Sequence, residues 1–390
     1  MDFNFNEAQE AVRDLAGRIF TERSTHERLK AVEADAGEHG PFDADLWSAL
    51  AESGLVGIGI GEDVGGGGLD FVAVAAVLEA AGRTAARVPV VEAMAYAAPA
   101  LERFGTQEQR ERWLGPLVRG ELILTAATAE WASDEDLVVP GVPVPATTAR
   151  PLPGGGWRIE GTKACVPFGL RADALLVPAS LHGAGAGAES ASVGVFIVPR
   201  SADGLTVRRQ DGTWAPEALV VLDGVEVGDE ALVGGAEADG AAVVSTIVDH
   251  AMAGLCVLEA GACAAALDLV GEYTKTREQF GKPIATFQAV GQRAADAYVD
   301  VEAVRLTAWQ AAWRLATGQP ADAELAVAKY WAAEGGQRAV HAAVHLHGGV
   351  GVDRDYPLHR YFLLTRQVEL TLGGAHDSLR RLGAILAAAS

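Results

Sequence analysis

The sequence is poor in cysteine and in basic residues, and each shortage argues against a class of protein. Only three of its 390 residues are cysteines, which fits a reducing compartment better than a disulfide-stabilised secreted protein. Two of them, Cys256 and Cys263, lie seven positions apart in an apolar helical stretch, so we expect core packing there and no metal site. Lysine and arginine number 31 against 52 acidic residues, a formal net charge of −21. This charge repels phosphate backbones, so we expect neither nucleic acid nor an anionic membrane as the main partner.

Long apolar runs and a targeting segment are missing too. The sequence has no run of about 18 uncharged apolar residues that could span a membrane. Its first residues, Met1–Phe5, include neither the basic nor the apolar segment of a secretory signal. We therefore expect a cytoplasmic protein without membrane insertion. Apolar residues nevertheless make up 49% of the chain, enough for two or three packed units with cores of their own.

The spacing of apolar residues divides the chain into three parts. Residues 1–120 show helical spacing, as in Phe42–Leu50, where acidic residues stand at the expected helix start. Residues 121–235 change to five short, valine-rich runs bounded by Gly, Pro, Asp or Ser, which is typical of antiparallel strands. Long alanine-rich amphipathic stretches follow in residues 236–390. We predict an α+β, mainly α, protein: an N-terminal helical domain, a middle antiparallel β-domain and a C-terminal four-helix bundle.

One motif in the last part is long and specific. The stretch Tyr273–Gln288 reads Y-x-x-x-R-x-x-F-G-x-P-I-x-x-F-Q, and a second block, His347–Gly351, is followed by Asp355–Pro357. These blocks resemble the signature of the acyl-CoA dehydrogenase family, flavoenzymes that desaturate acyl-CoA thioesters. The order helix, β, helix is also that family's, so the resemblance spans essentially the whole chain. It implies FAD as cofactor, an acyl-CoA substrate and assembly into a dimer or tetramer.

The residues that would hold the ADP part of FAD are present. A planar, permanently charged guanidinium suits pyrophosphate oxygens, and Arg277 is the candidate, although a surface arginine paired with an acid is the alternative. In the family, the Arg and Phe of this motif reach a neighbouring subunit's FAD, which implies that role for Arg277 and Phe280. Gln288 matches another position near the nucleotide, and His347 stands where the family often has Gln. Gly348–Gly349 would let the backbone approach phosphates, or would merely break a helix.

The residues expected beside the flavin ring are altered. The family's T-E-P-G strand corresponds to Thr128–Trp131, which keeps the glutamate but loses Pro-Gly. The resemblance places Thr128 and Ala129 near the flavin. Pro167 replaces the threonine whose hydroxyl meets the ring, and it has neither hydroxyl nor N–H. Cys165 replaces the tryptophan that flanks the ring.

Neither family position for the catalytic base carries an ionisable side chain. The family reaction needs a carboxylate to remove the α-proton, and burial can raise its pKa toward the working pH. Counting from Asp355–Pro357, the usual glutamate position is Leu372, and the alternative position falls at Ala251, or at Met252 if the register slips. Nearby titratable residues that could act instead, although each is more often solvated or capping, are Glu369, Glu259, Asp249 and His250.

These losses share a pattern. The chain keeps the part of the site that the family donates to a neighbour, and it loses much of its own catalytic half. The first hypothesis is a partner subunit that completes a sister's FAD site, in an enzyme acting on bulky CoA thioesters such as sterol side chains. The second is a self-sufficient homotetrameric dehydrogenase with a relocated base. The third is a non-catalytic acyl-CoA-binding scaffold on the same fold.

Overall fold

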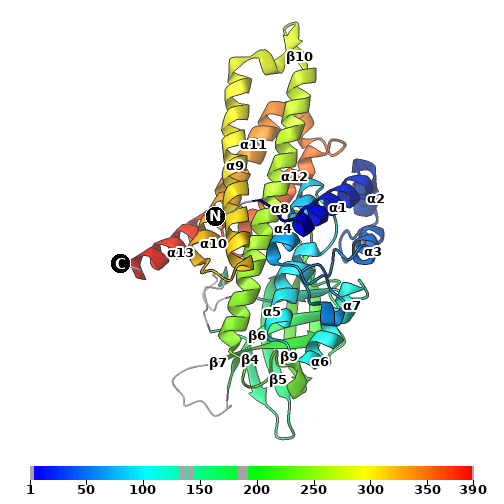
Figure 1. Cartoon of the computed structure of the whole chain (residues 1–390), viewed down its shortest axis with the longest axis vertical. Coiled ribbons are helices and arrows are strands. Elements are labelled where there is room, and N and C mark those ends of the chain that lie inside the picture. The colour runs from blue at the N-terminus through cyan, green and yellow to red at the C-terminus, as the bar shows by residue number, and fades with distance from the viewer. Residues whose placement is uncertain (1–3, 132–136, 139–143, 183–191, 389–390) are drawn as a thin grey trace. The chain divides into compact units, whose positions relative to one another are not determined.

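The computed structural model forms two compact units, which the chain enters more than once (Figure 1). It describes residues 4–131, 137–138, 144–182 and 192–388. The first unit comprises Met1–Ala31, Phe71–Arg87 and Met252–Ser390, and the second comprises Val32–Asp70 and Val88–Ala251. Each unit therefore combines segments that are distant in sequence, and domain boundaries at 1–120, 121–235 and 236–390 stay a prediction.

The first unit is helical. Its helices and helical turns are α1 (Glu7–Arg23), α2 (His26–Ala34, which ends in the second unit), α4 (Phe71–Arg83), α8 (Gly240–Thr276, which begins there), α9 (Gln288–Ala316), α10 (Asp322–Tyr330), η6 (Trp331–Gly335), α11 (Gly336–His347), η7 (Gly348–Val352), α12 (Leu358–Leu370) and α13 (Ala375–Ala388). A short hairpin, β10 (Glu278–Gln279) and β11 (Lys282–Pro283), joins α8 to α9 (Figure 1). A core cluster built on Cys263, Val301, Val340 and Leu358 fills the space between α8, α9, α11 and α12.

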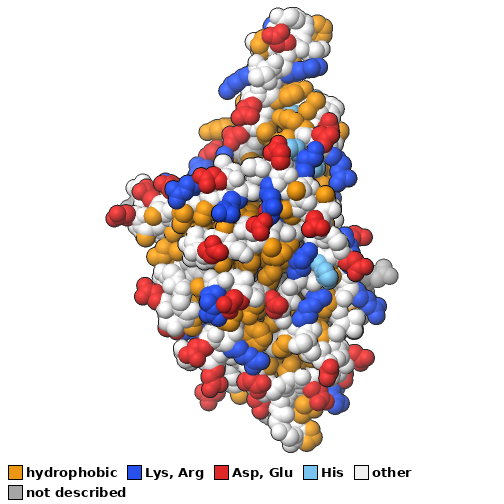
Figure 2. All heavy atoms as spheres, turned by 90° about the vertical axis from the view of Figure 1, so that its right-hand side faces the viewer, with side chains coloured by type: hydrophobic (Ala, Val, Ile, Leu, Met, Phe, Trp, Pro, Cys, Tyr) orange, Lys and Arg blue, Asp and Glu red, His pale blue; other side chains and the backbone are white. Residues whose placement is uncertain are grey.

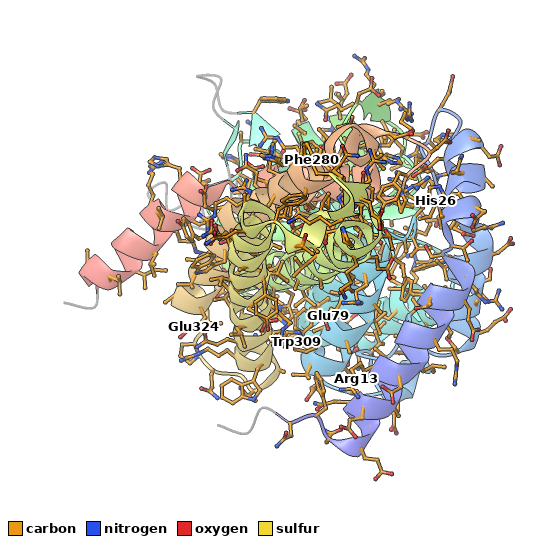
Figure 3. The ribbon with its side chains drawn as sticks, turned by 90° about the horizontal axis from the view of Figure 1, so that it is seen from above. Arg13, His26, Glu79, Phe280, Trp309 and Glu324 are labelled. Carbon is orange, nitrogen blue, oxygen red and sulfur yellow. The ribbon has the colours of Figure 1, made fainter. Side chains whose placement is uncertain are left out.

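Small residues let α4 and α8 touch backbone to backbone. A Cβ on Gly82 would lie 1.9 Å from the Leu258 carbonyl oxygen, and one on Gly261 would lie 2.1 Å from that of Glu79. Neither position can therefore carry a side chain without separating the two helices. Next to this crossing, the Trp309 indole donates to the Glu79 carboxylate at 3.4 Å (Figure 3). Burial raises the pKa of Glu79, and the cations of Arg305, Arg83 and Arg13 oppose that rise.

Helix α8 is also apolar enough, by length and composition, to cross a membrane. Of its most apolar 18-residue window, 67% is buried inside the protein, as is usual for the core helix of a globular domain. Acidic and basic side chains lie interspersed on the face shown in Figure 2.

The second unit contains the β-sheet and short helices. Its main sheet has seven strands, in the order β1-β6-β4-β5-β9-β8 with β7 also on β6. The strands are β1 (Leu124–Ala126), β4 (Thr148–Pro151), β5 (Trp157–Val166), β6 (Ala174–Leu181), β7 (Ser192–Pro199), β8 (Leu205–Gln210) and β9 (Glu217–Val227), with β2 (Glu130–Trp131) and β3 (Leu137–Val138) in a separate ladder. The helical elements are α3 (Ala44–Glu52), η1 (Glu62–Val64), η2 (Glu92–Ala97), α5 (Ala98–Phe104), α6 (Gln107–Gln109), η3 (Arg110–Leu114), α7 (Gly115–Val118) and η4 (Asp229–Ala231).

The predicted α+β, mainly α, fold with a middle β-domain is confirmed, and one detail of the sheet is corrected. All five valine-rich runs form strands, β5 to β9. The sheet is mixed and not wholly antiparallel, because β1 and β4 both pair with β6 in parallel. Parallel neighbours need a connection of a dozen residues or more, and the long excursion from β1 to β6 supplies one.

Candidate nucleotide and catalytic site

The Tyr273–Gln288 motif builds the hairpin between α8 and α9. Helix α8 ends at Thr276, and the Arg277 N–H donates to the Tyr273 carbonyl at 2.8 Å. The Ile284 N–H donates back to the Arg277 carbonyl, also at 2.8 Å. Gly281, with φ 75°, makes the tight turn between the two strands. The backbone of Arg277 is therefore held on both sides while its side chain remains exposed.

Arg277 and Phe280 are both exposed, and the Phe280 ring contacts its own chain only at its edge, against Phe287, among the ring contacts of the described residues. Phe280 is 92% exposed and has φ 54°, a conformation that costs a non-glycine residue on the order of 1 kcal/mol. Within the described part of the chain, the Arg277 guanidinium has no hydrogen-bond or ion-pair partner. Gln288, the first residue of α9, is exposed as well. A fork-shaped cation beside an exposed ring fits the phosphates and base of a nucleotide.

His347 is committed to contacts inside the chain. It is 3% exposed and stacks on Tyr273, with ring centroids 4.4 Å apart. Its Nδ1 lies 2.8 Å from the Ala343 carbonyl oxygen and its Nε2 lies 3.1 Å from the Tyr356 hydroxyl. Because burial lowers the pKa of His347, the neutral ring donates from Nδ1 and accepts at Nε2. Both ring nitrogens therefore have partners inside the chain. A nucleotide contact by His347 stays a prediction.

The glycines after His347 leave an open backbone. Gly348 has φ 62° and ψ −139°, and a Cβ on Gly348 or Gly349 would meet nothing within 4 Å. Gly351 is different, because a Cβ there would lie 2.9 Å from the Val344 carbonyl oxygen. The turn is thus packed at Gly351 and open at Gly348–Gly349. Ligand oxygens can approach its main chain, as the role near a phosphate requires.

The segments matched to the flavin ring have a defined backbone but few side-chain hydrogen-bond donors. Thr128 and Ala129 are half-buried between β1 and β2, where the Ala164 N–H donates to the Ala129 carbonyl at 3.0 Å. The Pro167 carbonyl accepts the Thr125 hydroxyl at 2.8 Å. Cys165 lies where the pairing of β5 with β9 is irregular, has φ 49°, and donates its N–H to Gln210 Oε1 at 2.8 Å. Neither Pro167 nor Ala129 has a side-chain donor for a ring oxygen or nitrogen.

Glu130 is retained for a structural reason. The buried Lys163 ammonium lies 2.5 Å from one Glu130 oxygen, and the N–H groups of Ala146 and Thr147 donate to the carboxylate at 2.6 and 3.0 Å. Burial alone would raise the pKa of Glu130, but Lys163 and these donors lower it overall. A carboxylate this well satisfied anchors β2 to β5 and is a poor proton acceptor.

Leu372, which the sequence matches to the family's base position, lies in a well-formed turn. Leu372 is half-buried between α12 and α13, with φ 59°, and Gly373 follows with φ 96°. The fully buried Lys329 caps the end of α12, because its ammonium donates to the Val368 and Glu369 carbonyls at 2.8 and 3.1 Å. At the alternative position, Ala251 is buried in α8. The turn is therefore held in place around an apolar side chain, and its match to the family's base position stays a prediction.

The other titratable candidates are engaged or enclosed. Glu369 pairs with Arg366 at 2.5 Å. His250 donates to the Thr246 carbonyl, and burial lowers its pKa to about 4. Asp249 is half-buried on α8. Glu259 is fully buried, accepts the Cys263 thiol at 3.0 Å, and has its pKa raised to about 7 by burial.

Positive φ values of non-glycine residues are concentrated in the segments matched to the site. Five non-glycine residues of the described chain have positive φ: Ala85, Cys165, Phe168, Phe280 and Leu372. Four of the five fall on or beside positions matched to cofactor or base contacts. Such conformations cluster at functional sites because packing must hold them against their cost. Sequence reasoning missed this strain and also the Tyr273–His347–Tyr356 stack, although both tyrosines stand inside the quoted motifs.

Comparisons with known proteins agree along the whole chain. Profiles of the acyl-CoA dehydrogenase N-terminal and C-terminal domains match residues 6–121 and 238–385. The chain is 40% identical to acyl-CoA dehydrogenase FadE27 of Mycobacterium tuberculosis over 99% of both proteins. Its structure is similar to the ChsE4-ChsE5 complex of that organism, with TM-score 0.87 and 37% identity over 99% of both chains. A variant of the Tcur3481-Tcur3483 steroid ACAD gives TM-score 0.86 and 40% identity over 98% of this chain and 99% of that one.

Proposed function

Since this chain belongs to the acyl-CoA dehydrogenase family, we propose that it acts in the FAD-dependent α,β-desaturation of an acyl-CoA thioester, as the subunit that completes a sister's FAD site. Members of the family are FAD-dependent oxidoreductases, which gives the reaction class. The observation that carries the proposal is the outward-facing, unpartnered Arg277 beside the exposed Phe280, in a chain whose base position holds Leu372.

The nucleotide residues have defined tasks in this proposal. Arg277 would hold the pyrophosphate with two parallel hydrogen bonds, and Phe280 would cover an apolar edge of the adenosine. Gln288 and the open Gly348–Gly349 turn would add polar contacts to the same half of the cofactor. Bound FAD supplies the acceptor for the hydride that leaves the β-carbon. All of these residues hold and orient the cofactor, and none of them moves a proton.

The proton step needs a group that this chain lacks at the family positions. A base must lie within hydrogen-bond reach of the α-proton, and Leu372 and Ala251 have no lone pair to offer. We place that carboxylate on the sister subunit. Two similar structures support such pairing by their names, because one is the ChsE4-ChsE5 complex and the other is the Tcur3481-Tcur3483 steroid ACAD. A bulky, steroid-like CoA thioester in a cytoplasmic enzyme is the corresponding substrate proposal.

Purification of the chain alone and together with a sister that carries the usual glutamate tests the proposal. FAD content from the absorbance spectrum and dye reduction with acyl-CoA are measured on both samples. We expect FAD and turnover only in the joint sample. FAD with turnover in the chain alone would favour the homotetrameric dehydrogenase. FAD in neither sample would favour the acyl-CoA-binding scaffold.

The homotetrameric alternative draws on one observation. Glu259 has its pKa raised to about 7, the range that suits a general base. Its carboxyl is fully buried among α8, α11 and α12 and faces Gly336, where an added Cβ would lie 2.4 Å from Glu259 Oε1. A substrate could reach it only if these helices separated, so the partner-subunit function is preferred.

A further inference from the structure

The second unit contains a polar cluster that the proposed function does not use. The turn η2 (Glu92–Ala97) is a π-helix, whose wider winding brings Glu92 and Tyr96 to one face. Tyr96 is 2% exposed, and η2 packs against β1. Single π-turns inside helices occur frequently at functional sites. We call the residues Glu92, Tyr96 and Glu217 the Tyr96 cluster.

The Tyr96 hydroxyl is buried without a hydrogen-bond partner among the described residues. More than nine in ten buried polar groups in proteins have one, and a buried hydroxyl left unpaired costs about 1–3 kcal/mol. Phenylalanine would fill the same space without that cost. The hydroxyl therefore indicates a partner outside the described residues, and a bound ligand is the candidate.

Neighbouring groups define what that partner can be. Glu217 begins β9 opposite Gln210 of β8, whose amide oxygen accepts the Cys165 N–H at 2.8 Å. Burial raises the pKa of Tyr96 well above its ordinary value, with Glu92 and Glu217 adding to the rise, so the hydroxyl keeps its proton. Burial, with a contribution from Glu217, raises the pKa of Glu92 to about 7. The cluster thus presents an O–H donor beside a carboxyl that can donate or accept.

This combination selects an uncharged oxygen. Phosphate or carboxylate would be repelled by Glu92 and Glu217. An ammonium group or an alkyl chain has no lone pair for the Tyr96 O–H. We propose that Tyr96 and Glu92 bind the oxygen of a hydroxyl or carbonyl group on the acyl part of the CoA thioester. This substrate class rests on the proposed function and adds to it an oxygenated acyl group.

The test uses the assembled protein, with its sister, and matched pairs of CoA thioesters. Each pair differs by one oxygen on the acyl part: octanoyl-CoA against 8-hydroxyoctanoyl-CoA, and a steroid-type CoA thioester with and without a ring oxygen. Binding is measured by calorimetry for the wild type, Tyr96→Phe and Glu92→Gln. We expect one oxygenated member to bind more tightly than its match. Tyr96→Phe should remove about 3- to 10-fold of that preference without changing the affinity for the plain member.

Control and stability measurements separate the alternatives. Tyr298→Phe, on an α9 tyrosine that is 57% exposed, should leave both affinities unchanged. Tyr96→Phe should keep the wild-type melting temperature, because its hydroxyl has no hydrogen-bond partner among the residues that the structure describes. A melting temperature lowered by several degrees, or failure to fold, would mean that a resident water or a protein group satisfies the hydroxyl, and would overturn the site.

The remaining outcomes also decide. A wild type without preference in any pair overturns the site, and so does an equal loss for both members of a pair in Tyr96→Phe. FAD content is recorded in the same samples. Normal FAD content without oxygen preference overturns this site alone, whereas absence of FAD in the assembled protein overturns the proposed function.

Discussion

The α8–α9 hairpin and the α12–α13 turn both contain residues that the sequence places in the predicted site, but they differ in the side chains that they present. In the hairpin, Arg277 and Phe280 are exposed, and the Phe280 ring has an edge contact with Phe287 at 6.1 Å between centroids. The turn has a defined backbone, with Leu372 at φ 59° and a buried lysine capping the preceding helix, but the position predicted for the base has an apolar side chain. The comparison teaches that a turn can have a defined backbone without a reactive side chain. In this chain, the side chains suited to a ligand lie on the exposed hairpin.

Turnover gives the largest test of this contrast. The chain alone should desaturate acyl-CoA at least about 10²-fold more slowly than the joint sample, the low end of what a general base contributes. Leu372→Glu should not restore activity, because Pro167 and Cys165 still deprive the ring side of its usual contacts. Dye reduction measures both. Ordinary turnover of the chain alone would contradict the contrast, and single substitutions of Glu369, Glu259, Asp249 and His250 would then locate the base.

Cofactor retention tests the hairpin side directly. Arg277→Ala should weaken FAD binding in the assembled protein by about 1.5–3 kcal/mol, the worth of a hydrogen bond to a charged group. Arg277→Lys should recover part of this loss, since it keeps the charge but not the fork. Arg208→Ala, on the exposed side of β8, is the matched control. FAD dissociation is followed by flavin fluorescence. An unchanged FAD dissociation constant in Arg277→Ala would show that Arg277 does not bind the cofactor.

The pH dependence of the unfolding free energy tests whether Glu259 is a buried, protonated carboxyl in the folded protein. Burial raises the folded-state pKa of Glu259 from 4.5 to about 7, so its stabilising contribution is full below pH 4.5 and is lost as pH rises through 7. The wild type should therefore lose about 2 kcal/mol from this group between pH 5 and pH 7. Glu259→Gln should remove that slope, and Glu278→Gln on the exposed hairpin should not. Denaturant unfolding at several pH values checks it, and equal slopes in all three proteins would refute it.

The smallest expected effect concerns Phe280. Phe280→Ser should change the unfolding free energy of the isolated chain by less than about 0.5 kcal/mol, because a ring that is 92% exposed contributes no core packing. Phe20→Ser, at a buried position of α1, should cost several kcal/mol in the same assay. A large loss of unfolding free energy in Phe280→Ser would show that the ring stabilises its own chain. The proposed role of Phe280 toward a neighbour's cofactor would then lose its support.

The sequence predicted the elements better than their pairing. Alternation of apolar and polar residues marks Trp157–Lys163 as a strand, and the valine-rich run Leu219–Val227 marks another, since each strand's faces are set locally. The parallel pairing of β1 and β4 with β6 depends on contacts between distant segments, which no local pattern records. The π-turn at Glu92–Ala97 escaped prediction for another reason, because its residues are ordinary helix formers.

The site was predicted unevenly for the same physical reason. The exposed positions of Arg277 and Phe280 follow from a short hairpin whose geometry is local, and their role toward a nucleotide stays a prediction. His347 was expected to contact a nucleotide, and that contact stays a prediction. Only the fold shows that the Ala343 carbonyl and the Tyr356 hydroxyl lie at its two ring nitrogens and that Tyr273 stacks on its ring. Tyr96 gave no signal at all, since an unpaired hydroxyl becomes visible only when its surroundings are known.

The depth of Lys329 has a consequence for ionic strength. Its ammonium is fully buried against the Val368 and Glu369 carbonyls, and salt screens buried charges far less than exposed ones. Arg277 stands in solvent until a ligand covers it, where the Debye length shrinks to about 3 Å at 1 M salt. Concentrated salt should therefore dissociate a nucleotide bound at Arg277 while the α12–α13 turn stays folded. The cofactor could then be removed without unfolding the protein.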